Sequence, residues 1–409
     1  MFLLPLAMKN MLRYRRRSII TAVAIMAGLG VYIGADSMFA GIEQNSERNF
    51  VDYEAGAAQV MRADYFAEMD YLPLNYCIQD PGAVREALSP LGFATTPRIR
   101  FMGELFLGDG SQQVRMIAVD PLSEARVLRV RETVSAGRYL EEGDEGVVIG
   151  GLLAEDLKAE IGSLLTLRTR TRDETTQTAE LEVVGIIDTP NPYLNKGVGF
   201  ITLAAADGLL HMDGAVTEIL IQTPEWRNPE KVGASAQGAI GVDSGLVVKT
   251  WRDLGTDFIS VVETHQSIYG LLLMAVLVIA AVGIVNTMLM AVYERFREIG
   301  MMRALGLADG SLRAVLLMEA GGIGLVGSLG GLLIGGALVF YLTHWGIDFS
   351  SLMGRMNVGY RINGVFRGAW NPSTMAVAFV AGIAISVTVS LIPASRALRR
   401  GITDCLRHV

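Results

Sequence analysis

The sequence contains few of the residues from which catalytic and metal sites are built. Its 409 residues include only two cysteines and four histidines, and charged residues make up 19% of the chain. The histidines have no metal-ligand spacing, and two cysteines cannot form a disulfide framework. The motifs G-x-x-x-x-G-K-[ST], H-E-x-x-H and G-x-S-x-G are absent, as is a basic surface interleaved with aromatic residues. We therefore expect neither an enzyme nor a nucleic-acid-binding protein, and no phosphate loop for ATP.

Long apolar runs dominate the chain instead. Hydrophobic residues make up 51% of it, and a helix needs about 20 consecutive apolar residues to cross the hydrocarbon core of a membrane. Four segments are long enough. We predict a membrane protein with four transmembrane α-helices, at residues 18–41, 267–293, 314–343 and 374–393, with a large α+β extracytoplasmic domain between the first two helices.

The basic residues indicate the orientation of these helices. Arginine and lysine gather in residues 1–17, 294–313 and 394–409, and such clusters favour the cytoplasmic side. Both termini and the 294–313 segment are thus expected inside, and residues 42–266 and 344–373 outside. A cleaved signal peptide is the alternative for the first apolar segment. Its apolar run is longer than the 7–15 residues of a typical signal core, which favours a retained helix.

Residues 1–17 have the pattern of a short amphipathic helix that lies along the inner face of the membrane, because Phe2, Leu3, Leu6 and Leu12 can enter the lipid while the arginines meet the phosphate headgroups. The alternative is that this segment is the frayed start of the first crossing helix.

The segment 42–266 has the strand and helix patterns of a soluble α+β domain. Residues 42–56 lack proline and extend the first helix outwards, and residues 251–266 lead helically into the second, so both are predicted stalks. Strands are predicted at 99–107, 114–119, 147–149, 164–170, 181–187 and 199–203, and helices at 83–88 and 150–162.

Glycine recurs in the third apolar segment. Gly327, Gly331 and Gly335 have four-residue spacing, which clears one helix face for close approach of another helix. Gly322, Gly324 and Gly327 also match the dinucleotide pattern G-x-G-x-x-G, but they lie inside an apolar helix without a preceding strand. We therefore interpret Gly324, Gly327, Gly331 and Gly335 as helix-packing residues.

A charged island, ERFREIGMMRALGLADGS, lies between the second and third apolar segments. Glu294 and Glu298 share one helix face, Leu305-Gly306 is predicted to end the helix, and Asp309 or Ser311 to cap the next one. A short cytoplasmic helix joined to two membrane helices is well shaped to receive a push from a partner. The alternative is a loop that only satisfies the charge rule.

The island resembles the signature of the FtsX-like permease family of ABC transporters. The family core E-R-x-x-E-I-G-x-x-[RK]-A-x-G corresponds to Glu294 through Gly306, and E-x-x-x-x-G follows at Glu319 and Gly324. The resemblance implies that a separate ATPase docks on the island. The residues that we predict to couple to it are Glu294, Arg295, Arg297, Glu298, Gly300, Arg303 and Gly306.

The outer region is similar to the periplasmic core domain of MacB and of the lipoprotein-releasing permeases LolC and LolE. The similarity lies in Gly137-Arg-Tyr-Leu140, EGVVIGGLLAEDLKAEIGSLLTL and LEVVGIIDT. It implies a multi-pass protein of the bacterial inner membrane with a periplasmic domain. The implied partners are two copies of an ABC ATPase, a second permease copy or a paralogue, a periplasmic carrier or adaptor, and membrane lipid. No cofactor is expected in this chain, since ATP and Mg would bind the ATPase.

Two departures from these relatives guide the functional prediction. About 17 residues precede the first apolar segment, so the ATPase fused there in MacB is expected on another chain. LolC has an apolar hook between two core strands, where this sequence has only the short polar segment Thr169–Thr178. We predict a permease that releases lipoproteins or related lipid-anchored substrates from the inner membrane. The alternatives are MacB-like efflux with an adaptor and FtsX-like mechanical signalling to a periplasmic enzyme.

Overall fold

The chain folds into two compact units. The computed structural model describes residues 3–13, 15–241, 244–256, 296–348 and 365–398, together with short interrupted stretches between 259 and 293, the longest of them 267–271. The helical unit comprises Met1–Glu43, Glu263–Asp348 and Val365–Val409, and the sheet unit comprises Gln44–Val262 and Phe349–Gly364.

The helical unit contains three helices that are long and apolar enough to cross a membrane. Among the described residues these candidate spans are Ser18–Ala55, Asp309–His344 and Pro372–Ser395. The predicted span 267–293 is described only at interrupted positions, where the residues are helical, and it is not among these candidate spans, so three of the four predicted spans are found. The helices of this unit are α1 (Leu3–Arg13), α2 (Arg15–Phe50), α12 (Phe296–Ala304), α13 (Asp309–His344) and α15 (Pro372–Leu398), with a short strand pair β11 (Ile347–Asp348) and β12 (Val365–Phe366).

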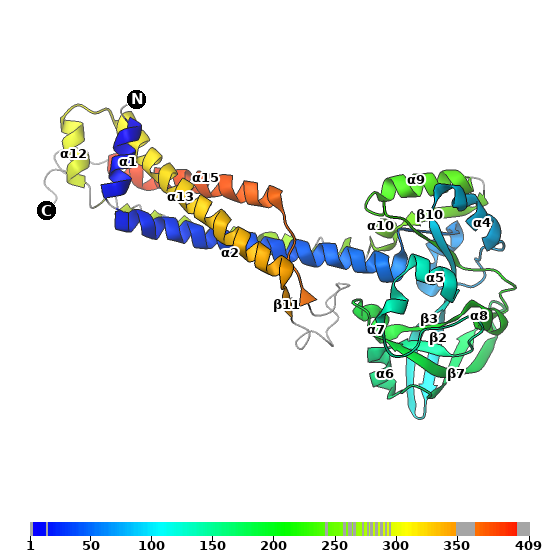
Figure 1. Cartoon of the computed structure of the whole chain (residues 1–409). Helices are drawn as coiled ribbons and strands as arrows, with labels where there is room; N and C mark the ends of the chain where they lie inside the picture. Colours follow the sequence, from blue (N-terminus) through cyan, green and yellow to red (C-terminus); the bar gives the residue numbers. More distant parts are fainter. Residues whose placement is uncertain are drawn as a thin grey trace. The chain divides into compact units, whose positions relative to one another are not determined.

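Helix α13 is central to the helical unit, where it packs along α2 and α15 (Figure 1). Glu319, two to three turns into α13, has a side chain that is only 2% exposed within this unit. The buried apolar side chains that join the helices are Ala22, Ile25, Leu29, Ile33, Ala320, Ile323, Val339 and Ala378.

Helix α1 is a separate helix rather than the frayed start of α2. It ends at Arg13, and Figure 1 shows it lying at an angle to α2. The hydroxyl of Ser18 donates to the carbonyl of Met11 at 3.3 Å, a seven-residue separation that a straight α-helix does not bring together. Met11 also packs against Gly322 of α13. The prediction of a separate N-terminal helix is therefore confirmed, and its contact is with α13.

The helix of the first predicted span continues into the sheet unit, as the sequence predicted. Helix α2 runs without interruption to Phe50, and a π-helical turn, η1 (Val51–Ala55), follows it. Of the second predicted stalk, α10 (Trp251–Leu254) begins the helix, while Phe258 and Val261 lie outside the described residues.

The sheet unit is built around a mixed sheet. In the described residues its strand order is β10-β1-β9-β2-β3-β8-β5-β7-β4, and β6 pairs with β2 and β7. Most pairs are antiparallel, whereas β3 with β8 and β5 with β7 are parallel. The strands are β1 (Ala58–Arg62), β2 (Ala94–Leu107), β3 (Gly110–Val119), β4 (Val134–Gly137), β5 (Val147–Gly150), β6 (Leu164–Arg170), β7 (Thr176–Ile187), β8 (Val198–Thr202), β9 (Glu218–Gln222) and β10 (Leu246–Thr250).

Short helices cover both faces of this sheet. Three of them begin in the same way, with an Asp or Asn side chain that accepts from the helix N-terminus and a proline at the first helical position. Successive side chains of β3 point to opposite faces of the sheet, so Met116 packs in the core on one face and Ile117 in the core on the other. The helices are α3 (Ala63–Ala67), α4 (Pro81–Leu88), α5 (Pro121–Val127), α6 (Gly151–Leu157), α7 (Pro192–Gly197), α8 (Leu203–Leu210) and α9 (Pro229–Ile240), with 3-10 turns η2 (Met69–Tyr71), η3 (Ser89–Leu91) and η4 (Val130–Thr133).

The α+β prediction and all six predicted strands are confirmed, but several boundaries are wrong. Strands β2 and β3 begin at Ala94 and Gly110, five and four residues before their predicted starts. Strand β7 begins at Thr176, five residues before the predicted start, because its polar half pairs with β6. Helix α6 ends at Leu157 instead of Gly162, since Lys158 adopts the left-handed conformation with φ of 55°. A lysine at that position gives no sequence signal for a helix end.

Candidate functional site

The charged island folds into helix α12, which ends in a hydrogen-bonded C-terminal turn. The amide of Leu307 donates to the carbonyl of Met302 at 3.1 Å, and that of Gly306 to Arg303 at 3.0 Å. With Gly306 at φ of 93°, this is a Schellman motif, in which glycine avoids the steric cost of the left-handed conformation. The predicted helix end at Leu305-Gly306 is confirmed.

The predicted cap of the next helix is wrong. Helix α13 has Ala308 at its N-cap, and no side chain caps it. Asp309 instead forms an ion pair with Arg303, with 2.9 Å between its Oδ1 and the arginine Nε. This pair bridges α12 and the first turn of α13, where a negative charge also suits the helix dipole.

The predicted coupling residues divide between two faces of α12. Glu298 lies 3.5 Å from the guanidinium of Arg13 in α1, Gly300 is buried, and the Arg303 side chain is only 13% exposed. Gly300 and Arg303 thus face the rest of the helical unit, whereas Arg297 is exposed and the partly exposed Glu298 lies beside it. Glu294 and Arg295 lie outside the described residues.

A stripe of exposed side chains runs along the face of α12 opposite Arg303, with Glu298 at its edge. Met301 is 51% exposed and Leu305 is 84% exposed. Together with Arg297 they recur every four residues and so share one helix face. We call Arg297, Met301 and Leu305 the exposed stripe. The predicted coupling residues did not include Met301 and Leu305, although the helical spacing of Met301 with Arg297 and Glu298 is visible in the sequence.

The glycines of α13 lie against α2. A Cβ atom added to Gly327, Gly331 or Gly335 would stand 2.7 to 2.8 Å from the Cβ of an α2 residue, closer than real side chains approach. The α2 residues are Ile25, Leu29 and Ile33, which have the same four-residue spacing. Gly324 faces α15, where its added Cβ would stand 2.8 Å from the Ser386 Cβ.

The segment Thr169–Thr178 forms the end of the β6–β7 hairpin. The Thr171 amide donates to the Thr175 carbonyl at 2.8 Å, the two threonine hydroxyls are 2.8 Å apart, and Glu174 completes the turn at φ of 61°. The amide of Arg172 donates to the Leu210 carbonyl, which ties the turn to the end of α8. The hairpin is therefore short and closed, with no extended insertion.

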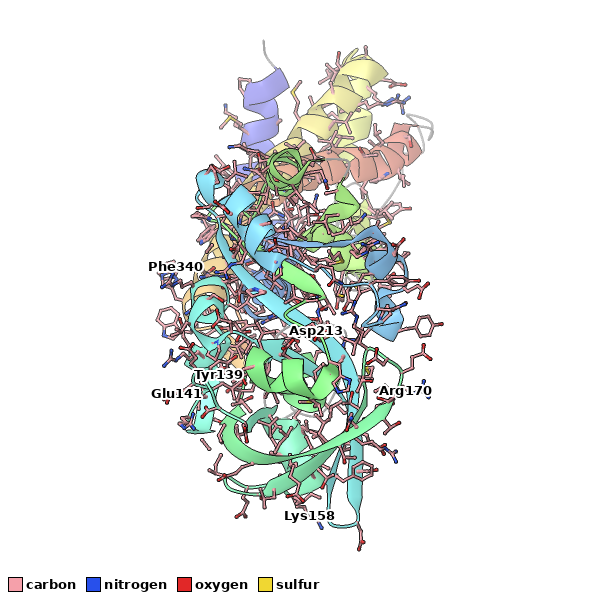
Figure 2. The ribbon with its side chains drawn as sticks, turned by 90° about the vertical axis from the view of Figure 1, so that its right-hand side faces the viewer. Tyr139, Glu141, Lys158, Arg170, Asp213 and Phe340 are labelled. Carbon is pink, nitrogen blue, oxygen red and sulfur yellow. The ribbon has the colours of Figure 1, made fainter. Side chains whose placement is uncertain are left out.

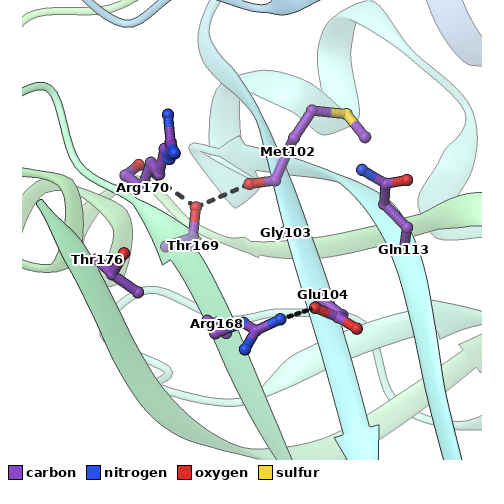
Figure 3. A pocket seen from close by; sticks show the side chains of 8 residues that line it. All are labelled: Met102, Gly103, Glu104, Gln113, Arg168, Thr169, Arg170 and Thr176. Atoms are coloured by element: carbon purple, nitrogen blue, oxygen red, sulfur yellow. Dashed lines mark hydrogen bonds and ion pairs between the residues drawn. The ribbon is translucent and has the colours of Figure 1, made fainter. Parts of the chain in front are cut away.

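A polar hollow of about 560 Å³ lies beside this hairpin (Figure 3). Arg168 pairs with Glu104 across its wall, and the Thr169 hydroxyl donates to the Met102 carbonyl at 2.8 Å. Arg170 is exposed, and Figure 2 shows it at the outer edge of the sheet unit. The hollow brings together no nucleophile and base, so its chemistry is that of a polar contact surface.

Two buried ion pairs stabilise the sheet unit. Arg98 pairs with Glu124, whose other oxygen accepts from the Tyr139 hydroxyl at 2.5 Å. Burial raises the pKa of Tyr139, and the charge of Glu124 raises it further. Arg98 also donates to the carbonyl of Glu54 in η1 at 3.2 Å, which fastens the turn after α2 to the sheet.

The second pair joins Arg100 to Glu218, 118 residues apart in the sequence. Burial lowers the pKa of Arg100, but the charge and hydrogen bond of Glu218 outweigh this effect, and the pKa is raised overall. Both pairs are structural, and the described residues contain no group of three or more side chains that would hold a metal ion.

Two family models match the chain. The model of the MacB-like periplasmic core domain matches residues 18–239, more than half of the chain, and that of the FtsX-like permease C-terminal region matches residues 270–402. The lipoprotein-releasing system transmembrane protein LolC of Neisseria meningitidis is 23% identical over 307 residues, which cover 72% of this chain and 73% of LolC.

Other relatives share smaller regions. The macrolide export ATP-binding/permease protein MacB of Paracoccus denitrificans is 31% identical over 123 residues, 30% of this chain and 16% of MacB. The periplasmic region of MacB from Actinobacillus actinomycetemcomitans is a structural neighbour with 11% identity and a TM-score of 0.33, covering 49% of this chain and 90% of that region.

Gly331→Val should weaken the contact between α13 and α2, because the added side chain meets the backbone and Cβ of α2. Overpacking of this kind costs about 1–3 kcal/mol. The matched control is Gly336→Val in the same helix, where an added Cβ would lie 3.8 Å from Met375. Thermal unfolding in detergent should show a lower Tm for Gly331→Val alone. Equal values for both variants would contradict the close packing.

Arg98→Met should destabilise the sheet unit by about 3–5 kcal/mol, because Glu124 is left buried without its counter-charge. Arg168→Met breaks the partly exposed pair with Glu104 and should cost less than about 1 kcal/mol. Urea denaturation followed by tryptophan fluorescence compares the two variants. A similar urea midpoint for both variants would show that the buried ion pair contributes little to the stability of the sheet unit.

Proposed function

The chain belongs to the family of FtsX-like ABC transporter permeases with a MacB-like periplasmic core domain, and from this premise we propose that it transmits work from a separate ATPase to its periplasmic domain. ATP and Mg bind the ATPase, which occurs in two copies, and the permease pairs with a second copy of itself or a paralogue. In this arrangement both termini and α12 are cytoplasmic. The work releases lipoproteins, or related lipid-anchored substrates, from the inner membrane.

The observation that supports the coupling role is that one face of α12 is bonded to neighbouring helices while another face is exposed. Glu298 faces Arg13 of α1, and Arg303 is paired with Asp309 of α13. The face opposite Arg303 presents the exposed stripe, in which two large apolar side chains reach solvent, and Glu298 lies at the edge of this stripe. A partner that binds this stripe therefore pushes on a helix that α1 and α13 hold in place. Glu294, Arg295, Gly300 and Gly306 are proposed to shape the same contact.

Helix α2 supports transmission away from the membrane. It is one continuous helix from Arg15 to Phe50, and its glycine-lined contact with α13 leaves no room for loose packing. The η1 turn that follows is bonded to Arg98 and, through Glu54 and Asn191, to the start of α7. A displacement of α13 would thus be carried along α2 to the base of the sheet.

Similarity to LolC over 72% of the chain favours lipoprotein release as the output. The closed β6–β7 hairpin argues against a carrier held by an apolar hook, so a carrier would contact this domain through polar surfaces. MacB-like efflux with an adaptor is the second candidate, favoured by the match of residues 18–239 to the MacB-like domain. FtsX-like signalling to a periplasmic enzyme is the third.

Met301→Ser with Leu305→Ser should detach the ATPase, because exposed apolar anchors at the centre of a contact carry much of its binding energy. A loss of about 2 kcal/mol or more corresponds to at least about a thirtyfold weaker complex. The control is Leu122→Ser, another exposed leucine, in the sheet unit. Co-purification of the ATPase and its ATP turnover provide the measurement. Retention of the ATPase by the double variant would exclude this docking face.

Depletion of the protein should slow the departure of newly made lipoproteins from the inner membrane. The rate is measured with pulse-labelled lipoproteins and membrane fractionation. A normal rate after depletion would exclude lipoprotein release as the function. Affinity purification of the protein distinguishes the other two candidate functions. Co-purification of a periplasmic adaptor with an outer-membrane duct would favour efflux. A bound wall hydrolase, with ATP turnover that does not respond to lipoprotein, would favour signalling.

A further inference from the structure

A second hollow, of about 440 Å³, lies in the sheet unit next to η1 and α10. Its floor is the sheet face that carries Arg100 of β2 and Arg115 of β3. Its walls include the aromatic side chains Phe66 and Tyr193 and the aliphatic Leu254. Nothing in the coupling mechanism uses this hollow, which we call the basal pocket.

The two arginines of the floor differ in how their charges are satisfied. The strand register places Met102 opposite Arg115 and Ile117 opposite Arg100, so both guanidiniums start from the same sheet face. Arg100 donates to Glu218 at 2.7 Å and to Gln59 at 2.8 Å. Its hydrogen-bonding capacity is therefore largely used by the protein.

Arg115 has no such partners. Its guanidinium carbon lies 5.0 Å from the centre of the Tyr193 ring, a cation–π contact. Within the part of the chain that the structure describes, its Nε has no hydrogen-bond acceptor, and the residue forms no ion pair. Its guanidinium lines the pocket without a counter-charge, so Arg115 is the group in this pocket with which an oxygen-bearing ligand would pair.

Carboxylates also line the pocket. Asp253 accepts from the amide and hydroxyl of Thr250, and Glu54 accepts from Asn191 at 2.8 Å. Asp70 is exposed and, among the described residues, has no ion-pair partner. A simple anion would be attracted by Arg115 but repelled by these carboxylates. A simple cation would be attracted by the carboxylates but repelled by Arg115.

We propose that the basal pocket binds a zwitterionic group in which an ammonium and an oxyanion are a few bonds apart. The oxyanion accepts from Arg115, the ammonium donates to Asp70, and Phe66 and Leu254 contact the apolar part. Two sources offer this chemistry, the headgroup of an aminophospholipid and a free amino acid. The site goes beyond the proposed coupling role, because it requires neither the ATPase nor a cargo.

Isothermal titration calorimetry on the full chain in dodecyl maltoside tests the charge requirement. Glycerophosphoethanolamine carries both charges, whereas inorganic phosphate and ethanolamine carry one each. Because each charge-assisted contact contributes, the zwitterion should bind at least about tenfold more tightly than either fragment. Glycerophosphocholine, whose ammonium has no N–H to donate to Asp70, should bind more weakly than glycerophosphoethanolamine. Equal affinity for the zwitterion and phosphate would overturn the proposal.

Variants test the assignment of the two charges. Arg115→Gln and Asp70→Asn should each weaken binding by about tenfold. Arg85→Gln and Asp156→Asn, two exposed positions outside the pocket, are the matched controls and should bind like the wild type. Asp70 is exposed, so its variant tests the site even if Arg115→Gln folds poorly, and Arg115→Lys offers a milder change. Wild-type affinity in both pocket variants would exclude the site.

Two further titrations identify the source. Vesicles containing phosphatidylethanolamine should compete with glycerophosphoethanolamine for the wild-type protein but not for Asp70→Asn if the ligand is a lipid headgroup. Tighter binding of alanine than of glycerophosphoethanolamine, lost in the same variants, would support the site and assign it to a free amino acid. Failure of both ligands to bind would overturn the proposal.

Discussion

The close contact between α13 and α2 is the constraint on which the proposed mechanism depends. Gly327, Gly331 and Gly335 stand where no Cβ fits against Ile25, Leu29 and Ile33. Each glycine inside a helix costs about 0.5–1 kcal/mol relative to alanine, and the tight contact compensates for that cost through van der Waals packing. The result is a pair of helices that move as one body. Helix α12 joins one end of this pair through the Arg303–Asp309 ion pair, and in the proposed mechanism a force on the exposed stripe passes through this ion pair to α13 and α2.

In the proposed mechanism the sheet unit receives this force. The η1 turn after α2 is bonded to Arg98, which is itself held by Glu124, and this buried pair is bonded in turn to Tyr139. Charges taken out of water are expensive unless each is fully paired, and a pair that loses one member is strongly destabilising. The network therefore resists deformation at the point where the helix meets the sheet. The β6–β7 hairpin and its polar hollow, in contrast, are exposed and free to meet a partner.

The elements that sequence predicted are those whose signal is local. Strand β6 has the predicted bounds because polar and apolar residues alternate along it, and the stop of α12 was readable from Leu305-Gly306. The glycine spacing on α13 was also visible, but not that α2 and α15 would be its neighbours. The left-handed Lys158 that ends α6 and the pairs Arg98–Glu124 and Arg100–Glu218 were not predictable, since they depend on residues brought together by the sheet. The exposed stripe required knowledge of which α12 face the rest of the unit covers.

The contact between α13 and α2 also constrains how these two helices diverge during evolution. On the α13 side the contact requires the absence of a side chain, and glycine is the one amino acid that provides it. On the α2 side it requires only a branched apolar side chain, for which isoleucine, leucine and valine are near substitutes. Related permeases that keep this contact should therefore exchange residues freely at positions 25, 29 and 33 while keeping glycine at 327, 331 and 335. An asymmetry of this kind in an alignment would mark the pairing of the two helices without a structure.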